Sequence, residues 1–245
     1  MLTLQDLLRT RTTQPPLNKA MYFNGTNAYI LLSKAPYAYL KNPFTWIVWA
    51  LVYPMTTDIE YIMEQNRTKD NFNYEAILQL YYGKVNYWEY DTAFGLNFTN
   101  NTRVDDAKWH QIAFVRTTSN GAIYIDGKLD ASTTGRVAEI RNDYVLAIGV
   151  DYRDWFTVSK PRWFYGYIAQ ILIYRDKALT QNEIQHNMLN PNNPIRENLI
   201  LWYDARACGT SKNICYDLSG NGNHGTMYNV QIVTLSNPVR VGGRL

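Results

Sequence analysis

Three carboxylates stand close together in the stretch TTDIEYIME, namely Asp58, Glu60 and Glu64. Side chains alternate between the two faces of a strand, so a strand here is expected to present all three on one face. Retaining glycoside hydrolases use two carboxyl groups about 5 Å apart. Asp58 and Glu60 are the pair that approaches this spacing, which makes cleavage of a glycosidic bond one candidate chemistry. The alternative is a charged outer face of an edge strand.

Oxygen-bearing side chains gather at two other places. The stretch GVDYRDW supplies Asp151 and Asp154, and FNGTN supplies Asn24 and Asn27. Calcium takes several oxygen ligands at once, so Asp151, Asp154 and Asn24 are candidate metal ligands. Neither stretch matches a calcium loop of the form D-x-D-x-D-G. The structural alternative is that these side chains cap turns.

Aromatic rings beside polar groups suit a sugar-binding surface, because tyrosine and tryptophan have an apolar body and a polar end. Trp88 and Tyr90 alternate on one face of a predicted strand and form one candidate pair. The alternative for exposed aromatics is packing against a neighbouring subunit. The other candidate ligand-binding residues lie in one long predicted loop: Tyr152, Arg153, Asp154, Trp155, Arg162 and Trp163.

The two cysteines, Cys208 and Cys215, are separated by six residues in ACGTSKNIC. They are expected to form a disulfide in an oxidising compartment and to stay free in a reducing one, and the sequence leaves both open. His224 offers only one further soft ligand, too few for a zinc site. The three histidines lie far apart, and neither a G-x-S-x-G motif nor a phosphate-binding loop occurs.

The composition is that of a globular protein. The 245 residues are 46% hydrophobic and 18% charged, which is enough apolar material for a sizeable core. A net charge of only +3 gives no reason to expect a nucleic-acid partner. No apolar stretch of about 18 residues occurs, so no membrane span is expected. The first twenty residues do not have the pattern of a secretory signal.

Apolar and aromatic stretches bounded by turn residues predict strands along most of the chain. Gly83-Lys84 and Asp126-Gly127 are expected to form hairpin turns. This spacing predicts an all-β fold, a two-sheet antiparallel sandwich. One short helix is expected near 180–189, because Thr180 and Glu183 have the spacing of a capping box. The predicted strands cover residues 45–53, 74–83, 84–91, 109–117, 121–129, 144–150 and 164–175.

Four stretches resemble the concanavalin A-like lectin/glucanase superfamily, in particular its laminin-G-like and pentraxin-like modules. They are KAMYFNGTNAYILL, FTWIVWALVYP, WHQIAFVRTTSNGAIYIDGKLDAS and FYGYIAQILIYRDKALTQNEIQHNM. The resemblance implies a jelly-roll sandwich, and it implies calcium at a loop rim that holds sugars or partners. Hydrolases with this fold carry E-x-D-x-E or E-x-D-x-x-E, whereas this chain reads D-x-E-x-x-x-E. We therefore expect no enzymatic activity.

The order of the segments departs from the resembling modules. A stretch like LILWYDA…DLSGNGNHGTMYN usually comes first in them, but here it comes last, so the chain looks circularly permuted. We expect an N-terminal arm (1–16), the main body of the sandwich (17–190), and a connector with C-terminal strands (191–245). Those strands complete either their own sandwich or that of a neighbour in a homo-oligomer. Self-completion is preferred, because exchange through a short loop is the exception.

Three functions are compatible with these features. The first is a non-enzymatic, lectin-like binding or adhesion module that recognises a glycan or a surface glycoprotein. The second is a structural protein of a virion or surface filament, which the missing secretory signal favours. Both place the protein at a virion or cell surface. A glycoside hydrolase that uses Asp58 and Glu60 is the weakest of the three.

Overall fold

The computed structural model describes nine stretches of the chain. The predicted N-terminal arm (1–16) lies outside the described residues, and so do the candidate ligand-binding residues Arg153, Asp154 and Trp155. The described residues are 17–32, 39–40, 43–66, 75–91, 93–138, 140–141, 145–152, 162–209 and 211–235.

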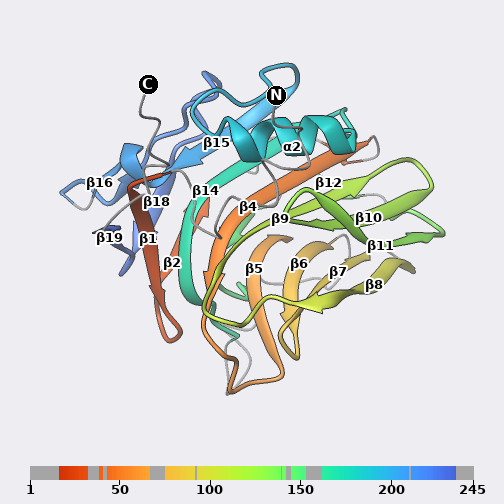
Figure 1. Ribbon diagram of the computed structural model, residues 1–245, viewed down its shortest axis with the longest axis horizontal. Coiled ribbons are helices and arrows are strands. Elements are labelled where there is room, and N and C mark those ends of the chain that lie inside the picture. Colours follow the sequence, from red (N-terminus) through yellow and green to blue (C-terminus); the bar gives the residue numbers. More distant parts are fainter. Residues whose placement is uncertain are drawn as a thin grey trace, which may run out of the picture.

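Two antiparallel sheets lie against each other with their apolar sides facing (Figure 1). In the described residues the first sheet has eight strands, and β15 pairs with β14 beside the main strand order. Its strands, in spatial order, are β11 (Lys128–Thr134), β10 (Asn120–Ile125), β9 (Trp109–Arg116), β4 (Phe44–Val52), β14 (Tyr165–Arg175), β1 (Lys19–Asn24) and β19 (Gln231–Thr234), with β15 (Leu199–Asp204).

The second sheet has nine strands within the described stretches, and a separate short pair joins β3 (Tyr39–Leu40) to β12 (Ile140–Arg141). This architecture confirms the predicted all-β, two-sheet antiparallel jelly-roll sandwich. The nine strands, in spatial order, are β16 (Cys208–Gly209), β17 (Ile214–Cys215), β18 (Gly225–Tyr228), β2 (Tyr29–Leu32), β13 (Val145–Ile148), β5 (Ile59–Asn66), β6 (Glu75–Tyr81), β7 (Lys84–Tyr90) and β8 (Phe94–Arg103).

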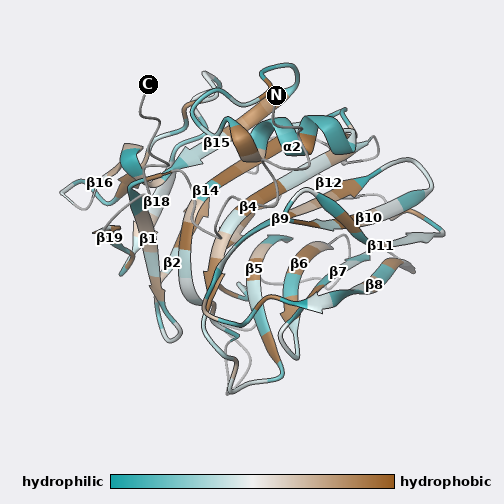
Figure 2. Cartoon of the chain, viewed as in Figure 1, coloured by the Kyte–Doolittle hydropathy of each residue, from teal (hydrophilic) through white to brown (hydrophobic). Residues whose placement is uncertain are grey.

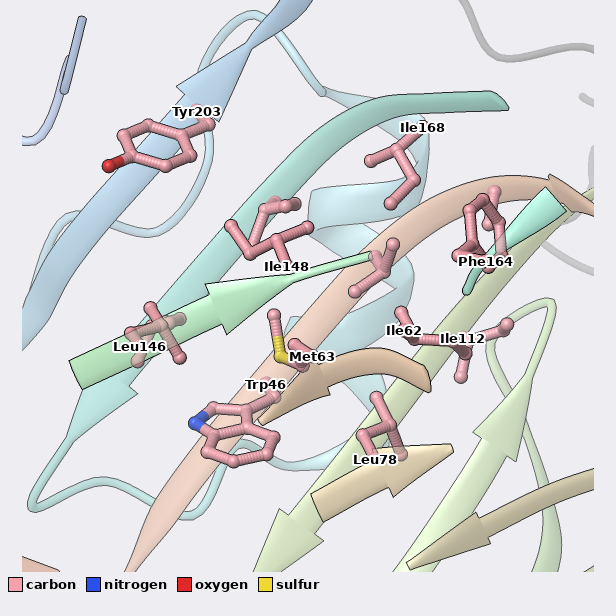
Figure 3. Close-up of a cluster of buried hydrophobic side chains, with 14 of the residues drawn as sticks. Trp46, Ile62, Met63, Leu78, Ile112, Leu146, Ile148, Phe164, Ile168 and Tyr203 are labelled. Atoms are coloured by element: carbon pink, nitrogen blue, oxygen red, sulfur yellow. The ribbon is translucent and has the colours of Figure 1, made fainter. Parts of the chain in front are cut away.

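The core lies between the two sheets. Strand alternation sends every second side chain inward, so Trp46 and Ile112 of the first sheet meet Leu78 and Leu146 of the second (Figure 3). All four side chains are essentially inaccessible to solvent. Burial of each large apolar side chain contributes about 1.5–3 kcal/mol. The apolar stretches of β4 and β14 appear brown in Figure 2.

The helix α2 (Gln181–Leu189) covers the outer face of the first sheet (Figure 1). Thr180 and Glu183 form the predicted capping box, with the Thr180 side chain accepting from the backbone N–H of Glu183. Ile184 packs among side chains of β4, β9 and β14, and Met188 packs with Trp49 and other residues near one end of the sheet. The predicted helix is therefore confirmed. The described part of the chain contains no helix long and apolar enough to cross a membrane.

The C-terminal segment supplies strands to both sheets of its own chain. β14 pairs with β1 along its first half and with β15, followed by the 3₁₀ turn η2 (Ala205–Ala207), along its second half. β19 pairs with β1, and β18 pairs with β2 in the other sheet. In this structure the segment thus completes its own sandwich. Exchange with a neighbour and the circular permutation both stay predictions.

Cys208 lies directly opposite Cys215 in the β16–β17 pair, and their sulfur atoms are joined as a disulfide.

The hairpin turn between β6 and β7 consists of Tyr82 and Gly83, with φ values of 49° and 78°, and Lys84 already belongs to β7. The turn predicted at Gly83-Lys84 was therefore wrong by one residue, because a two-residue hairpin with positive φ at both positions matches the strand twist.

Candidate functional site

The three carboxylates of TTDIEYIME do not share one face. Asp58 is exposed and precedes β5, Glu60 lies opposite Leu80, whose side chain is in the core, and Glu64 lies opposite Ile77 on the outer face. The cause is a β-bulge at Ile62, where the pairing register shifts. The bulge sends two successive side chains, Ile62 and Met63, into the core and reverses the alternation beyond them (Figure 3). The prediction of a single carboxylate face was wrong for this reason.

Each of the two buried carboxylates holds a backbone amide. Glu60 Oε2 accepts from the backbone N–H of Tyr165 at 3.0 Å, and Glu64 Oε2 accepts from that of Tyr152 at 3.0 Å. Burial raises the pKa of Glu60 to about 7, although the Tyr165 hydrogen bond opposes that rise. These contacts anchor β14 and the segment after β13 to β5, which is a structural role.

The outer face of β5–β8 carries a groove of about 490 Å³. Register explains its floor, because Tyr61 lies opposite Gln79, Gln79 opposite Asn86, and Asn86 opposite Thr99. A second row places Trp88 opposite Asn97. The lining residues are Ile59, Tyr61, Gln79, Tyr81, Asn86, Trp88, Asn97, Thr99 and Arg162.

A ladder of side-chain hydrogen bonds fixes the polar floor of the groove. Gln79 Nε2 donates to Asn86 Oδ1 at 2.8 Å. Asn86 Nδ2 donates to Asn97 Oδ1 at 3.2 Å and to Thr99 Oγ1 at 3.0 Å. Within the described residues, neither Gln79 Oε1 nor Asn97 Nδ2 makes a hydrogen bond, so the ladder ends in one acceptor and one donor. Such ends match ligand hydroxyl groups, which both donate and accept.

Aromatic rings stand on both sides of this amide ladder. Trp88 lies parallel to Tyr90, with ring centroids 6.0 Å apart and an interplanar angle of 7°. On the other side, Arg162 Nη1 donates to Tyr61 Oη at 3.3 Å, and its guanidinium lies 5.9 Å from the Tyr61 ring centroid. Tyr81 adds a ring that is 42% exposed. The groove therefore combines apolar ring faces, amide groups and one guanidinium. Such a combination suits a ligand that has both apolar and polar faces.

The predicted aromatic loop is only partly joined to the groove. Arg162 lines the groove, but Trp163 and Tyr152 pack with Tyr29 of β2 in a separate cluster. The ring centroids of Trp163 and Tyr29 are 6.1 Å apart, and Trp163 forms an isolated β-bridge with Val150. The structure thus brings together Trp88 and Arg162, while Tyr152 and Trp163 lie beside another part of the same sheet.

The predicted calcium ligands that the structure describes are engaged in other contacts. Asn24 Oδ1 accepts three backbone N–H groups, from Thr26, Asn27 and Ala28, at 3.0, 3.0 and 3.2 Å. This is the turn-capping alternative. Asp151 is fully buried, and its Oδ2 lies 3.5 Å from Arg162 Nη1. No group of three or more His, Cys, Asp or Glu side chains suited to a metal was found among the described residues.

Several groove residues were not predicted as site residues from the sequence, namely Tyr61, Gln79, Asn86, Asn97 and Thr99. A signal for some of them exists. Asn86 and Trp88 alternate in KVNYWEY, as do Asn97 and Thr99 in GLNFTNNT, and this period of two places each pair on one face of its strand. The predicted hairpin places residues 74–83 beside 84–91, but its turn is one residue too late, and residues 94–103 were not predicted as a strand. The ladder therefore could not be assembled from these local patterns.

Comparisons with known proteins bear on this arrangement. The family model described as the concanavalin A-like lectin/glucanases superfamily matches residues 24–185, more than half of the chain. No curated protein sequence matches the chain.

Solved structures with the same fold include three that carry sugar-related descriptions. A protein from Bacteroides ovatus described as carbohydrate-binding has a TM-score of 0.68 and 20% identity, covering 92% of this chain and 62% of its own. The module CBM40 of a Ruminococcus gnavus sialidase, bound to α2,3-sialyllactose, has a TM-score of 0.54 and 13% identity, covering 73% of this chain and 100% of its own. Domain 4 of an extracellular GH43 arabinanase from Geobacillus stearothermophilus, in complex with arabinotriose, has a TM-score of 0.53 and 19% identity, covering 69% of this chain and 76% of its own. This chain thus spans 62% of the length of the Bacteroides ovatus protein.

Proposed function

Because this chain belongs to the concanavalin A-like lectin/glucanases superfamily, we propose that it is a non-catalytic carbohydrate-binding module whose ligand occupies the groove on β5–β8. The partner is a glycan, either free or carried on a surface glycoprotein. The observation that carries this proposal is the amide ladder from Gln79 through Asn86 to Asn97, flanked by the rings of Trp88 and Tyr61.

The chemistry of the groove suits a sugar in two ways. A pyranose or furanose ring has a face of C–H groups, which packs on an aromatic ring such as Trp88, and an edge of hydroxyl groups. Gln79 Oε1 accepts a hydroxyl hydrogen, and Asn97 Nδ2 donates to a hydroxyl oxygen. The hydrogen bonds within the ladder hold both amides in place before a ligand arrives, which reduces the entropy lost on binding.

Among the described residues, the groove lining lacks the pair of carboxyl groups that hydrolysis needs. Its nine lining residues in the described structure include no Asp or Glu. Glycoside hydrolysis needs a pair of carboxyl groups on either side of the bond. Glu60 lies on the core side of β5 and Glu64 holds the Tyr152 amide, so neither joins the groove lining. This supports binding without cleavage.

The neighbouring structures support the same proposal through their bound ligands. One holds α2,3-sialyllactose and another holds arabinotriose. Both share the fold with this chain at identities of 13% and 19%, so they suggest oligosaccharides to test and do not identify the ligand.

Glycan-array screening followed by isothermal titration tests the proposal. The array should yield at least one oligosaccharide that binds, and Trp88→Ala should lower its affinity about tenfold or more, because a stacked ring is lost. Asn86→Leu should also weaken binding, since it breaks the ladder. Tyr165→Ala is the matched control, because Tyr165 is an exposed tyrosine on the first sheet and is 39% exposed. Binding that Trp88→Ala and Asn86→Leu leave unchanged would place the ligand elsewhere.

A further inference from the structure

The face of the second sheet that carries the groove also carries an aromatic stack near its other end. Tyr29 of β2 and Tyr228 of β18 are directly paired, with ring centroids 4.4 Å apart and an interplanar angle of 3°. Tyr29 is 7% exposed and Tyr228 is 40% exposed. Tyr228 therefore has one ring face covered by Tyr29, and another part of its side chain is open to solvent.

This stack is held rigidly from beneath. Tyr29 packs with Ala147, Val150 and Trp163. Burial raises the pKa of Tyr29 to about 12, so its hydroxyl stays neutral throughout the physiological range. Beside the stack, Asn229 Nδ2 donates to the backbone oxygen of Asn27 at 3.0 Å, and both asparagines are exposed. A fixed ring with amide groups at its border repeats, on a smaller scale, the combination found in the groove.

Register shows that the stack and the groove lie on the same face of one sheet. One row of residues that are paired across the sheet, from β18 to β8, lies on this outer face. The Tyr29–Tyr228 pair lies two residues along the strands from this row. Five strand spacings separate β7 from β18, which corresponds to about 24 Å. The row runs Thr226, Leu31, Ala147, Glu64, Ile77, Trp88 and Asn97. Its three central members, Ala147, Glu64 and Ile77, are buried. Residues that follow β13 contact two of them, because Trp163 packs in the cluster of Ala147 and the Tyr152 backbone N–H donates to Glu64.

We propose that Tyr228 is a second contact for the glycan that occupies the groove, so that the protein selects glycans long enough to reach from Trp88 to Tyr228. This inference rests on the proposed function. Arg162 lines the groove and the adjacent Trp163 packs on Tyr29, so the surface between the two contacts is also partly aromatic. A trisaccharide is too short for this span, whereas a chain of six or more sugars reaches across it. Two contacts on one ligand strengthen binding through effective concentration.

The experiment compares short and long members of one oligosaccharide series. Isothermal titration is carried out with arabino-, xylo-, manno- and cello-oligosaccharides of two to eight residues, and with the matching polysaccharides. Wild-type affinity should rise about tenfold between the trisaccharide and the octasaccharide of the series that binds. Tyr228→Ala should remove that rise and leave trisaccharide affinity unchanged. Tyr228→Phe keeps the ring and should behave as wild type, and Tyr165→Ala is the control on the other sheet. A thermal melt of each variant verifies folding.

Each outcome bears on a different part of the reasoning. Equal wild-type affinity for the trisaccharide and the octasaccharide overturns the second contact and leaves the groove standing. The same follows if Tyr228→Ala binds the octasaccharide as tightly as wild type does, or weakens both ligands equally. Trisaccharide binding that Trp88→Ala leaves intact overturns the proposed function at the groove. A protein that binds no member of any series and no glycan on the array overturns both proposals.

Discussion

A buried ion pair ties the two sheets together directly beneath the groove. Arg116 of β9 and Glu89 of β7 are both fully buried, and Arg116 Nε donates to Glu89 Oε2 at 2.9 Å. Tyr87 Oη donates to the same carboxylate oxygen at 2.8 Å. The other oxygen accepts from the backbone N–H groups of Leu96 and Ala138, at 3.1 and 2.8 Å. Because Glu89 follows Trp88 in β7, this network fixes the strand that carries the main aromatic of the groove.

Glu89→Gln should lower the free energy of unfolding by about 3–5 kcal/mol, because it leaves the Arg116 guanidinium charged in a place that water does not reach. Arg116→Met should cost a similar amount, since it leaves the carboxylate with neutral donors alone. The double variant removes both charges together. Its loss should therefore be smaller than the sum of the two single losses by about 2–3 kcal/mol.

Urea unfolding followed by tryptophan fluorescence measures these differences, provided that the slope with urea is unchanged. Lys108→Gln is the control, because Lys108 pairs with Asp106 at 2.6 Å but its side chain is 60% exposed. That change should cost less than about 1 kcal/mol. A Glu89→Gln cost no larger than that of Lys108→Gln, or additive losses in the two core variants, would show that the buried pair does not couple the sheets.

Three further predictions concern other parts of the fold. Neither polar side-chain atom of the buried Gln111 has a hydrogen-bond partner among the described residues, so Gln111→Met should raise the free energy of unfolding by about 1–2 kcal/mol; a decrease would indicate a buried water. Burial raises the pKa of Glu60 from its ordinary 4.5 to about 7, so the stability it contributes is complete below pH 4.5 and is lost as the pH rises to about 7. The free energy of unfolding of Glu60→Gln, measured relative to wild type by urea unfolding, should therefore rise by about 3 kcal/mol between pH 4.5 and 7. A difference that does not change with pH would contradict this. Denatured, unreduced protein should show no free thiol from Cys208 or Cys215, and reduction should cost about 2–3 kcal/mol; thiols detected before reduction would refute the bond.

The regular parts of this fold could be predicted from sequence because their patterns are local. Apolar and aromatic runs mark β4, β9 and β14, which are buried on both faces for most of their length. The Asp126-Gly127 turn has the positive φ values, 52° and 72°, that a two-residue hairpin turn needs. The start of the helix is marked by Thr180 and Glu183, because a Thr followed three residues later by a Glu is the sequence signature of a capping box.

The irregular parts could not be predicted because they depend on partners distant in the sequence. IEYIMEQN reads as an uninterrupted strand, and the bulge at Ile62 exists only in its pairing with β6. The amide ladder likewise depends on the register of β6, β7 and β8, which local patterns do not specify. The packing of Trp163 on Tyr29 likewise could not be predicted, because Tyr29 is distant in the sequence, and a ligand contact at Trp163 stays a prediction.

The pairing of β1 with β19 and of β2 with β18 has a consequence for how the protein is made. During synthesis the edges of β1 and β2 emerge long before the strands that cover them, because β18 and β19 belong to the last part of the described chain. Pairings this distant in sequence close slowly. Until Thr234 has left the ribosome, a nascent chain therefore presents open backbone edges that invite association with other chains.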